Sequence, residues 1–340
     1  MNAPPAQHQG DAFYQPREQE YFFPTENGTW TSTHTQSPAV THSEPTANPK
    51  AIRLISWNID ILVGFAEERM TAALEYLNGL VSSTPADIPV VVFLQEMGQS
   101  DLEQIRNAKW IHERFNITEL DGKHWLNPLY GTTTLVDRRL KISNVFRVPW
   151  LSKFDRDGLF VDISISHPSL SDGKVLRLCN THLESLIADP PVRPAQLAAA
   201  ATYLQKTEVA CALLAGDLNA IQPFDKTLHS ENGLKDTYLE LGGVEGTDEG
   251  YTWGYQVPQW MKDKFGCSRM DKILFRGDVK PKTFERVGAG VKIAEEHRAK
   301  AREAGEEEWV TDHYGVMGDF ELTGDWTLQG HGTDARAKLS

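Results

Sequence analysis

Cysteine and long apolar runs are both scarce in this sequence. Its 340 residues include three cysteines, which are too few and too scattered for a disulfide framework or a zinc site of the usual spacing. No apolar run approaches the roughly 18 residues that a membrane span requires. The start, MNAPPAQHQGDAFYQ, has neither a basic beginning nor the apolar stretch of a signal peptide. We therefore expect an intracellular protein of the nucleus or the cytoplasm, without a membrane span.

Positive charge is also lacking, since the formal net charge is −13. A surface that coats nucleic acid broadly needs clustered Lys and Arg, and the composition argues against such a surface. An enzyme that grips a single phosphodiester through a bound cation remains compatible with it. The carboxylates that hold a metal ion make a protein more acidic.

Aliphatic residues are nearly missing from residues 1–50, which contain no Leu or Ile, one Val, and seven of the eighteen prolines. Such a segment cannot bury enough apolar surface to offset its ordering entropy, so we expect a mostly disordered tail. The composition becomes globular over 51–322, where neither an internal repeat nor a linker is visible. We predict one domain over 51–322 and a polar C-terminal tail over 323–340.

Short β-rich runs recur within this domain. They cover residues 51–58, 89–96, 132–137, 158–166, 174–182, 211–219, 269–277 and 314–322. Several are apolar throughout, which is typical of a sheet covered on both faces. Apolar residues at steps of three and four predict helices over 67–81 and 193–206, whereas 292–309 is polar nearly all round and predicts a solvated helix or a loop. The pattern favours stacked sheets with helices outside.

Polar side chains stand where these apolar runs end. They are Asn58, Glu96, His182, Asp217 and Asn219, with Asp312 and His313 directly before the last run. Each of them alone is a plausible turn or cap residue, but five such ends meeting at one sheet edge would form a site. Glu96 and Asp312 are hard oxygen ligands suited to Mg²⁺, and Asp217 could orient or deprotonate a water. Two imidazoles and two side-chain amides could donate to a phosphate as its charge grows.

Two common catalytic motifs are missing. The sequence has no G-x-x-x-x-G-K-[ST] loop, which argues against a P-loop nucleotide site, and no serine in a G-x-S-x-G elbow. Metal-assisted attack of water on a phosphate ester is the reaction that the remaining residues would serve.

Six short motifs occur in an order that is known from one superfamily. SWN, LQE, THLES, GDLN, MDKILF and TDHYG, spread over the predicted domain, resemble the endonuclease/exonuclease/phosphatase superfamily of Mg²⁺-dependent phosphoesterases. The resemblance implies an α/β fold, the DNase-I-like four-layer sandwich of two stacked mixed β-sheets flanked by helices. It also implies Mg²⁺ as the cofactor, with Mn²⁺ as a substitute.

The resemblance implies a set of metal ligands. Glu96 would be the main ligand, with Asn58 beside it and Asp312 as a further contributor, directly or through a water.

It also implies the catalytic groups. Asp217 would orient the attacking water, and Asn219 would hold the phosphate. His182 and His313 would stabilise the transition state, and Asp271 would hydrogen-bond His313 and fix its tautomer.

Further motifs resemble the tyrosyl-DNA phosphodiesterase 2 group within this superfamily. WNID followed by ERM, RPAQL after THLES, YTWGYQ and SRMDKILFR match that group's pattern at corresponding places. These enzymes remove a tyrosyl peptide from a 5′ DNA phosphate, as left by an aborted topoisomerase II. The resemblance therefore implies a DNA-repair enzyme that acts on 5′-tyrosyl DNA ends, and we expect a monomer.

Two departures from the pattern of that group stand near the expected substrate. No basic residue follows GDLN before Lys226, and 292–309 looks like an insertion. The alternative is another phosphoesterase of the superfamily, namely a nuclease, a deadenylase, a phosphoinositide phosphatase or a sphingomyelinase-like enzyme. A non-catalytic scaffold is disfavoured because every expected catalytic residue is present.

Substrate contacts are the remaining expectation. Trp253 and Tyr251 of YTWGYQ would form a wall for stacking a base or the leaving aromatic group, or would be core aromatics under a loop. Arg156 and Arg193 are candidates for phosphate contacts, as is Lys153, although each could be an ordinary solvated charge.

Overall fold

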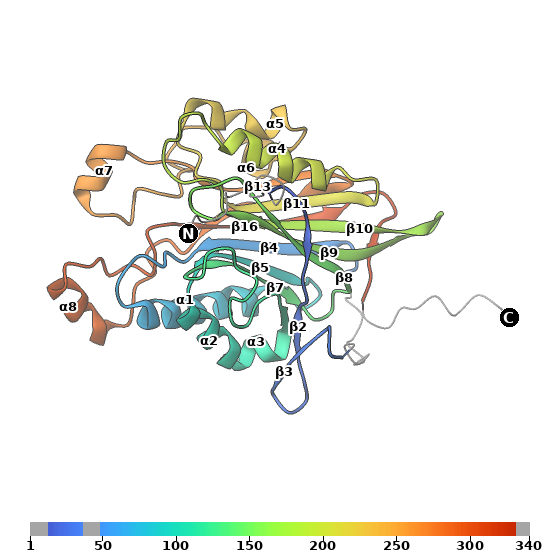
Figure 1. Cartoon of the computed structure of the whole chain (residues 1–340), viewed down its shortest axis with the longest axis horizontal. Coiled ribbons are helices and arrows are strands. Elements are labelled where there is room, and N and C mark those ends of the chain that lie inside the picture. The colour runs from blue at the N-terminus through green and yellow to red at the C-terminus, as the bar shows by residue number, and fades with distance from the viewer. Residues whose placement is uncertain (1–12, 37–47, 331–340) are drawn as a thin grey trace, which may run out of the picture.

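Two β-sheets are stacked face to face in the computed structural model, which describes residues 13–36 and 48–330 (Figure 1). The first sheet runs in the order β1-β8-β9-β10-β11-β13-β12, with β17 paired to β9. Its strands are Arg17–Glu18 (β1), Ile142–Pro149 (β8), Asp157–His167 (β9), Leu170–Thr181 (β10), Val209–Asp217 (β11), Lys235–Asp236 (β12), Asp271–Gly277 (β13) and Thr327–Leu328 (β17). The second sheet runs β14-β16-β4-β5-β7-β6-β2-β3, with β15 paired to β16. Its strands are Phe22–Pro24 (β2), Trp30–Ser32 (β3), Ala51–Asn58 (β4), Val90–Met97 (β5), Phe115–Ile117 (β6), Gly131–Asp137 (β7), Val279–Pro281 (β14), Glu285–Val287 (β15) and Gly315–Leu322 (β16).

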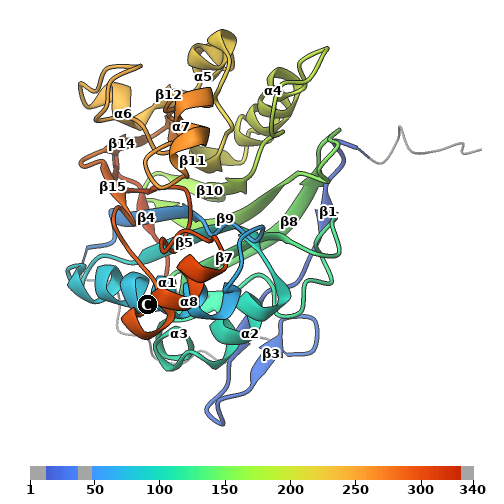
Figure 2. The same cartoon turned by 90° about the vertical axis from the view of Figure 1, so that its left-hand side faces the viewer.

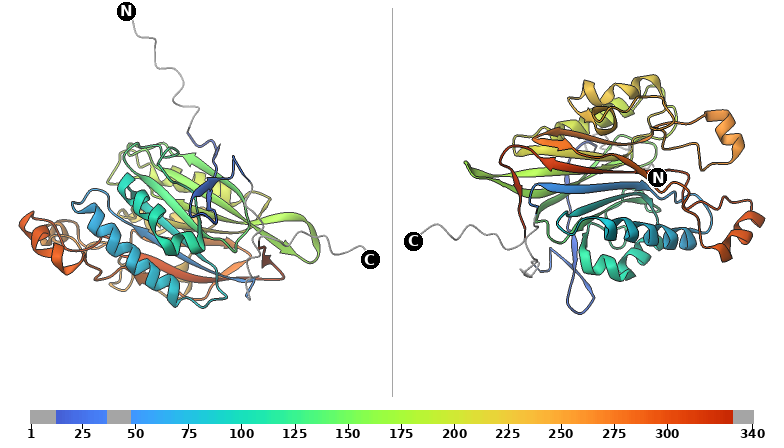
Figure 3. Two further views of the ribbon diagram at one scale, coloured as in Figure 1. Left: turned by 90° about the horizontal axis from the view of Figure 1, so that it is seen from below. Right: turned by 180° about the vertical axis from the view of Figure 1, so that it is seen from behind.

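Helices cover the outer face of each sheet. The first sheet carries Arg193–Leu204 (α4), Leu228–Glu231 (α5) and Thr237–Glu240 (α6), and the second carries Ala66–Ser83 (α1), Gln99–Asn107 (α2) and Lys109–Arg114 (α3) (Figures 1 and 3). This order of layers confirms the predicted four-layer sandwich of mixed sheets. Two further helices, Gln259–Phe265 (α7) and Glu295–Glu303 (α8), project from one side of the molecule, the side that faces the viewer in Figure 2. Within the described residues, no helix combines the length and the apolar character needed to cross a bilayer.

The helix α1 shows how the sequence sets these layers. Its acidic first turn, with Glu67 and Glu68, suits the positive end of the helix dipole. The predicted stripe is buried against the second sheet, from Met70 to Val81. Both helices predicted from periodicity are present, with α1 slightly longer and α4 slightly shorter than expected.

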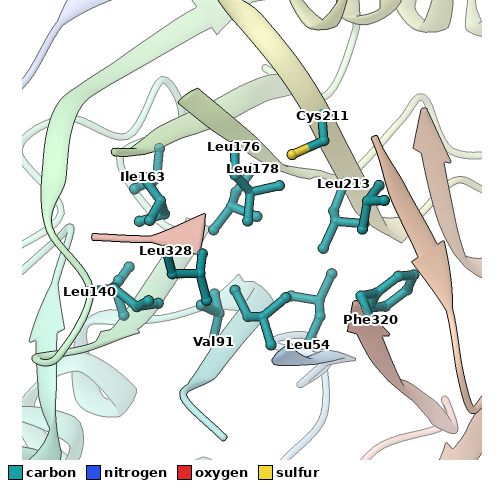
Figure 4. Packing of buried hydrophobic residues seen from close by; sticks show 14 of the residues in the cluster. Leu54, Val91, Leu140, Ile163, Leu176, Leu178, Cys211, Leu213, Phe320 and Leu328 are labelled. Atoms are coloured by element: carbon teal, nitrogen blue, oxygen red, sulfur yellow. The ribbon is translucent and has the colours of Figure 1, made fainter. Parts of the chain in front are cut away.

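The core between the sheets consists of aliphatic side chains that face one another across the interface. In Figure 4, Leu176, Leu178 and Leu213 of the first sheet point toward Leu54 and Val91 of the second. Separate apolar clusters lie under the helices on either side. Strands β4, β5 and β11 are therefore buried on both faces, which explains their nearly continuous apolar sequences.

Strand direction brings the predicted polar residues to one edge. Strands β4 and β5 are parallel, as are β10 and β11, so their carboxyl ends meet at the same side of each sheet. Strands β13 and β16 are antiparallel to β11 and β4, and they begin at this side, where Asp271 pairs with Asp217 and Val316 pairs with Ser56. We call this side, where the residues predicted to be catalytic lie, the catalytic edge.

A buried amide pair fixes the two sheets to each other just inside the catalytic edge. Asn180 of β10 accepts from Gln95 Nε2 of β5 at 2.8 Å and donates to the carbonyls of Thr133 and Leu94. All these groups lie away from water, where an unpaired amide is costly, so the pairing specifies how the sheets are aligned.

The N-terminal segment corrects one expectation. Residues 13–36 do not behave as the expected disordered tail, because β1 pairs with β8 and β2 pairs with β6, while Tyr21, Phe22 and Phe23 are buried. A short aromatic patch supplies the apolar surface that the missing aliphatic residues would have provided. Residues 1–12 and 37–47 lie outside the described residues.

The C-terminal expectation is corrected in the same way. Residues 323–330 contain β17, and Trp326 and Leu328 belong to the core between the sheets. Residues 331–340 lie outside the described part of the chain. Residues 13–36 and 323–330 therefore pack against the predicted 51–322 domain.

Phe22→Ala tests whether the N-terminal segment is part of the folded unit. Removal of this buried ring should lower the free energy of unfolding by about 3–5 kcal/mol, measured by urea titration. Glu26→Ala, in the exposed turn of the same segment, is the control and should change it by less than about 0.5 kcal/mol. Equal, small effects of both changes would show that the segment does not contribute to the core.

Candidate active site

Glu96 stands at an irregularity at the end of β5. The register between β5 and β7 shifts between Leu94 and Met97, and Glu96 has φ 53°, in the left-handed region. Such a bulge turns a side chain away from its regular direction, and non-glycine residues adopt this φ rarely. The carboxylate lies 3.5 Å from Arg156 Nη2 and 3.7 Å from His182 Nδ1. The backbone therefore holds an acidic group against two residues of the first sheet's loops.

Asp217 is the most connected carboxylate at the catalytic edge. Its Oδ2 accepts from Asn58 Nδ2 at 3.1 Å and lies 3.2 Å from His182 Nε2 and 3.6 Å from His313 Nε2, while Oδ1 accepts from the backbone N–H of Asn219. Burial alone would raise the pKa of Asp217, but the two imidazoles hold that pKa well below its usual range. The carboxylate is therefore ionised and a weak base.

His182 has a defined tautomer because of its two partners. Arg156 Nη1 lies 2.8 Å from His182 Nδ1, and a guanidinium can only donate, so Nδ1 must accept. Nε2 then carries the hydrogen that faces Asp217. Arg156 also donates to Ser185 Oγ at 2.9 Å, while its Nε is buried without a partner among the described residues. The expected Arg156 is thus part of the site.

His313 lies between two carboxylates. Its Nδ1 donates to Asp271 Oδ2 at 2.8 Å, and its Nε2 faces Asp217. Burial alone would lower the pKa of His313, but Asp271, Asp217 and Asp312 raise it well above the ordinary value. Burial raises the pKa of Asp271 to about 6, although the facing His313 acts in the opposite direction. The Asp271–His313 hydrogen bond is the one that the sequence resemblance implies.

Asp60 is a site residue that the sequence analysis missed. It follows Asn58 by two residues, and its backbone N–H donates to Asn58 Oδ1 at 2.9 Å. Burial and then repulsion from Asp312 and Glu96 raise the pKa of Asp60 to about 8. The loop after β4, the end of β5 and the segment before β16 thus each place a carboxylate close enough for Asp312 and Glu96 to repel Asp60. The signal was present in the sequence, because Asp60 extends the polar end of the first predicted strand.

Two neighbouring groups could hold a metal ion. One is the set of acidic side chains Asp60, Glu96 and Asp312 beside Asn58, in which Asp312 and Glu96 repel Asp60 and whose oxygens are spread more widely than those of the second group. In the other, ligand atoms of Asp217, Asp271 and His313 lie within 4.8 Å of one another, and all three residues are buried. Sequence reasoning had placed Asp217, Asp271 and His313 among the catalytic residues and not among the metal ligands.

Asn219 is held by the loop after β10. It has φ 47°, and its Nδ2 donates to the carbonyl of Leu183 at 3.1 Å and to Ser185 Oγ at 3.4 Å. Asn219 thus connects the ends of β10 and β11. Ser185 accepts from both Asn219 and Arg156, so it is a shared acceptor inside the site.

The expected aromatic wall is not formed. Trp253 is 8% exposed, and its indole N–H donates to Asp312 Oδ2 at 2.6 Å, which leaves it to position that carboxylate. The Tyr251 hydroxyl donates to the carbonyl of Gly246, in a neighbouring loop. The structure thus supports the alternative of a core aromatic for Trp253.

Arg193 also differs from its expected role. All five of its N–H groups are used inside the protein, on Asp225, Gln222 and the carbonyls of Glu184 and Leu186. A buried guanidinium with no free donor cannot bind a substrate phosphate, so Arg193 is a support for the loop after β10. Lys153 remains exposed, and its backbone N–H donates to Glu184.

The segment 292–309, predicted to be an insertion, contains α8 and is attached to the acidic side of the site. Arg69 of α1 is buried and donates to the carbonyls of Gly64, Glu307 and Trp309. It thereby ties the loop that carries Asp60 to the segment that leads to Asp312.

The sequence matches the Endonuclease/Exonuclease/phosphatase family over residues 55–313. No curated protein matches the chain. Among solved structures, a humanised D. rerio TDP2 is 22% identical, with a TM-score of 0.60 over 80% of this chain and 99% of that chain. D. rerio TDP2 complexed with single-strand DNA product is 20% identical, with a TM-score of 0.59 over the same shares of the two chains. The human Nocturnin catalytic domain with bound sulfate is 15% identical, with a TM-score of 0.52 over 82% of this chain and 96% of that chain. These likenesses show a common fold.

Replacement of Asp271 by Asn should lower the pKa of His313. Among the groups that raise this pKa, Asp271 has the largest effect, so the value should fall toward the ordinary 6.5. An NMR titration of the imidazole in metal-free protein measures the change. Asp263→Asn, on the exposed surface of α7, is the control and should leave the titration as in the wild type. An unaltered His313 pKa in Asp271→Asn would contradict the pairing.

Proposed function

The chain belongs to the endonuclease/exonuclease/phosphatase family, and from this premise we propose that it is a Mg²⁺-dependent phosphodiesterase. Its substrate is the bond between a tyrosine and the 5′ phosphate of a DNA end. Acting as a monomer in the nucleus or the cytoplasm, it would serve the repair of topoisomerase II adducts.

The observation that carries the proposal is the cluster of Asp60, Glu96 and Asp312 beside Asn58. All of these groups offer oxygen atoms, which Mg²⁺ prefers. Burial and then repulsion from Asp312 and Glu96 raise the pKa of Asp60, and a divalent cation would relieve that repulsion. Asp271 and His313 are already bonded to each other through the Nδ1 hydrogen, so we assign the metal to the Glu96 group. When bound there, the ion would polarise the scissile phosphate and stabilise the leaving oxygen.

Asp217 orients the attacking water. Its low pKa makes it a poor proton acceptor, and its two oxygens are already fixed by Asn58 and Asn219, so its contribution is to place the water rather than to remove a proton. Asn219 and Asn58 are held rigidly at either side of it. This rigidity keeps the reacting atoms in position.

Two imidazoles support the phosphate. His313 is charged and offers its Nε2 hydrogen, and Asp271 fixes its orientation. His182 is oriented by Arg156, which places a guanidinium beside the site. Donors fixed before the reaction stabilise the charge that develops on the phosphate oxygens.

The substrate assignment is supported by the order of the sequence motifs and by the likeness to TDP2 structures, one of which contains a single-strand DNA product. One observation favours a different phosphoester. No basic residue follows the GDLN motif before Lys226, and Ile221 in this stretch is exposed. Another phosphoesterase activity of the family is therefore the second candidate.

Glu96→Gln tests the metal site. The substitution keeps the shape of the side chain but removes a charge, so turnover of a 5′-tyrosyl oligonucleotide should fall by about two orders of magnitude or more, and more Mg²⁺ should be needed. Glu249→Gln, an exposed carboxylate elsewhere, is the matched control and should behave as the wild type. EDTA should abolish activity, and full activity in EDTA would contradict the metal-dependent mechanism.

The same assay decides the substrate. A 3′-tyrosyl oligonucleotide, an abasic duplex, poly(A) and a phosphoinositide should each be hydrolysed much more slowly than the 5′-tyrosyl oligonucleotide. Faster hydrolysis of any of them would transfer the assignment to that phosphoester.

A further inference from the structure

Four aliphatic side chains are exposed on the loops of the first sheet at the catalytic edge. Leu151 follows β8, Leu186 and Ile187 follow β10, and Ile221 follows β11; their exposed fractions are 51%, 67%, 73% and 36%. We call these four residues the apolar ledge. Leu186 and Ile187 are neighbours in the chain, and the loops that carry all four residues begin at the same edge as the site. Exposed apolar groups that form a continuous patch mark a contact surface.

Hydrogen bonds hold these loops together. Glu184, in the loop after β10, accepts from the Ser152 hydroxyl and the Lys153 backbone N–H of the loop after β8. Asn219, in the loop after β11, donates to the carbonyl of Leu183. Arg193 joins the loop after β10 to Gln222. The ledge is therefore carried by one cross-linked set of loops.

The apolar ledge continues directly from the catalytic residues. Ser185, whose hydroxyl accepts from Arg156 and Asn219, immediately precedes Leu186. A group bound on the ledge would thus lie next to a phosphate held by these residues.

The backbone presents Leu186 in a fixed way. Its φ is 64°, a left-handed value that β-branched and bulky residues adopt rarely, and Arg193 binds its carbonyl at 2.8 Å. Arg193 is itself buried and paired with Asp225. A strained conformation that the surroundings enforce is typical of a functional position.

The charge around the ledge selects against a polyanion. The exposed charged residues of these loops balance, with Lys153 and Lys226 against Asp155 and Asp189. A DNA backbone would need unbalanced positive charge here. An uncharged apolar group is the occupant that the surface fits.

We propose that the apolar ledge binds the apolar peptide residues that flank the tyrosine of the adduct. This proposal rests on the proposed function, whose substrate consists of a DNA end and a peptide. It gives the enzyme a preference for a tyrosine within a peptide over a single tyrosine. The ledge is thus a specificity determinant that acts through contact with the protein part of the substrate.

The test compares two 5′-tyrosyl oligonucleotides, one with a single tyrosine and one with a tyrosine inside a short apolar peptide. The wild type should show a kcat/KM about tenfold higher for the peptide adduct, since two or three partly buried aliphatic groups produce a gain of that size. In Leu186→Asn/Ile187→Ser this ratio should fall to about one, because the ledge is lost while Asn tolerates the left-handed φ. Leu170→Ser, at another exposed leucine (49%) at the start of β10, should keep the wild-type ratio.

Hydrolysis of a nitrophenyl phosphodiester separates the ledge from the proposed substrate. If the wild type cleaves this ester but neither oligonucleotide, the proposed DNA substrate is wrong. Whether the ledge binds an apolar peptide is then tested by inhibition of ester hydrolysis with the free apolar peptide. If the peptide inhibits the wild type but not the double variant, the proposed peptide binding is supported. If it inhibits both proteins equally, the proposal is overturned. An unaltered adduct ratio in the double variant overturns it as well. If the wild type binds phosphatidylcholine vesicles and the double variant does not, the ledge binds a lipid surface and the peptide proposal is overturned.

Discussion

The buried carboxylate of Asp217 is the charge on which the arrangement of the site depends. A carboxylate in this position would be unstable alone. It accepts a hydrogen bond from Asn58 at the end of β4 and is stabilised by the nearby imidazoles of His182 after β10 and His313 before β16. Each donor is in turn positioned by a further group. The ionised carboxylate of Asp217 therefore fixes the positions of a side-chain amide and two imidazoles. Without it, these groups would face one another with no negative charge between them.

Sheet topology makes this convergence possible. Parallel pairs β4/β5 and β10/β11 end at the same edge, and the antiparallel partners β13 and β16 begin there. The buried bond between Gln95 and Asn180 sets one sheet against the other a short distance below. The acidic groups stand mainly on loops of the second sheet, and the loops with Arg156 and His182 belong to the first. The alignment of the two sheets therefore sets the distance between the proposed metal ligands and the proposed phosphate donors.

Sequence patterns predicted much of this arrangement, and the exceptions have physical reasons. Apolar runs ending in polar residues identified the strands and their ends, because burial on both faces leaves a strong local signal. The strand β8 was missed because Ser143, Asn144 and Arg147 interrupt its apolar pattern. Arg147 is buried because Asp157, Thr132 and Gln19 accept its hydrogen bonds. Whether such a charged residue is buried depends on partners that are distant in the sequence. The same applies to Arg193, whose five donors are satisfied internally, and to Trp253, which is bound to Asp312.

The central claim is that the carboxylates of Asp60, Glu96 and Asp312, with Asn58, form the metal site, while Asp217, Asp271 and His313 serve the reaction. A crystal structure with Mn²⁺, located by anomalous diffraction, tests this claim most directly. The account predicts a single strong peak in contact with an oxygen of Glu96 and on the side of Asp60 and Asp312. A peak coordinated instead by Asp217, Asp271 and His313, with the Asp271–His313 hydrogen bond broken, would contradict it.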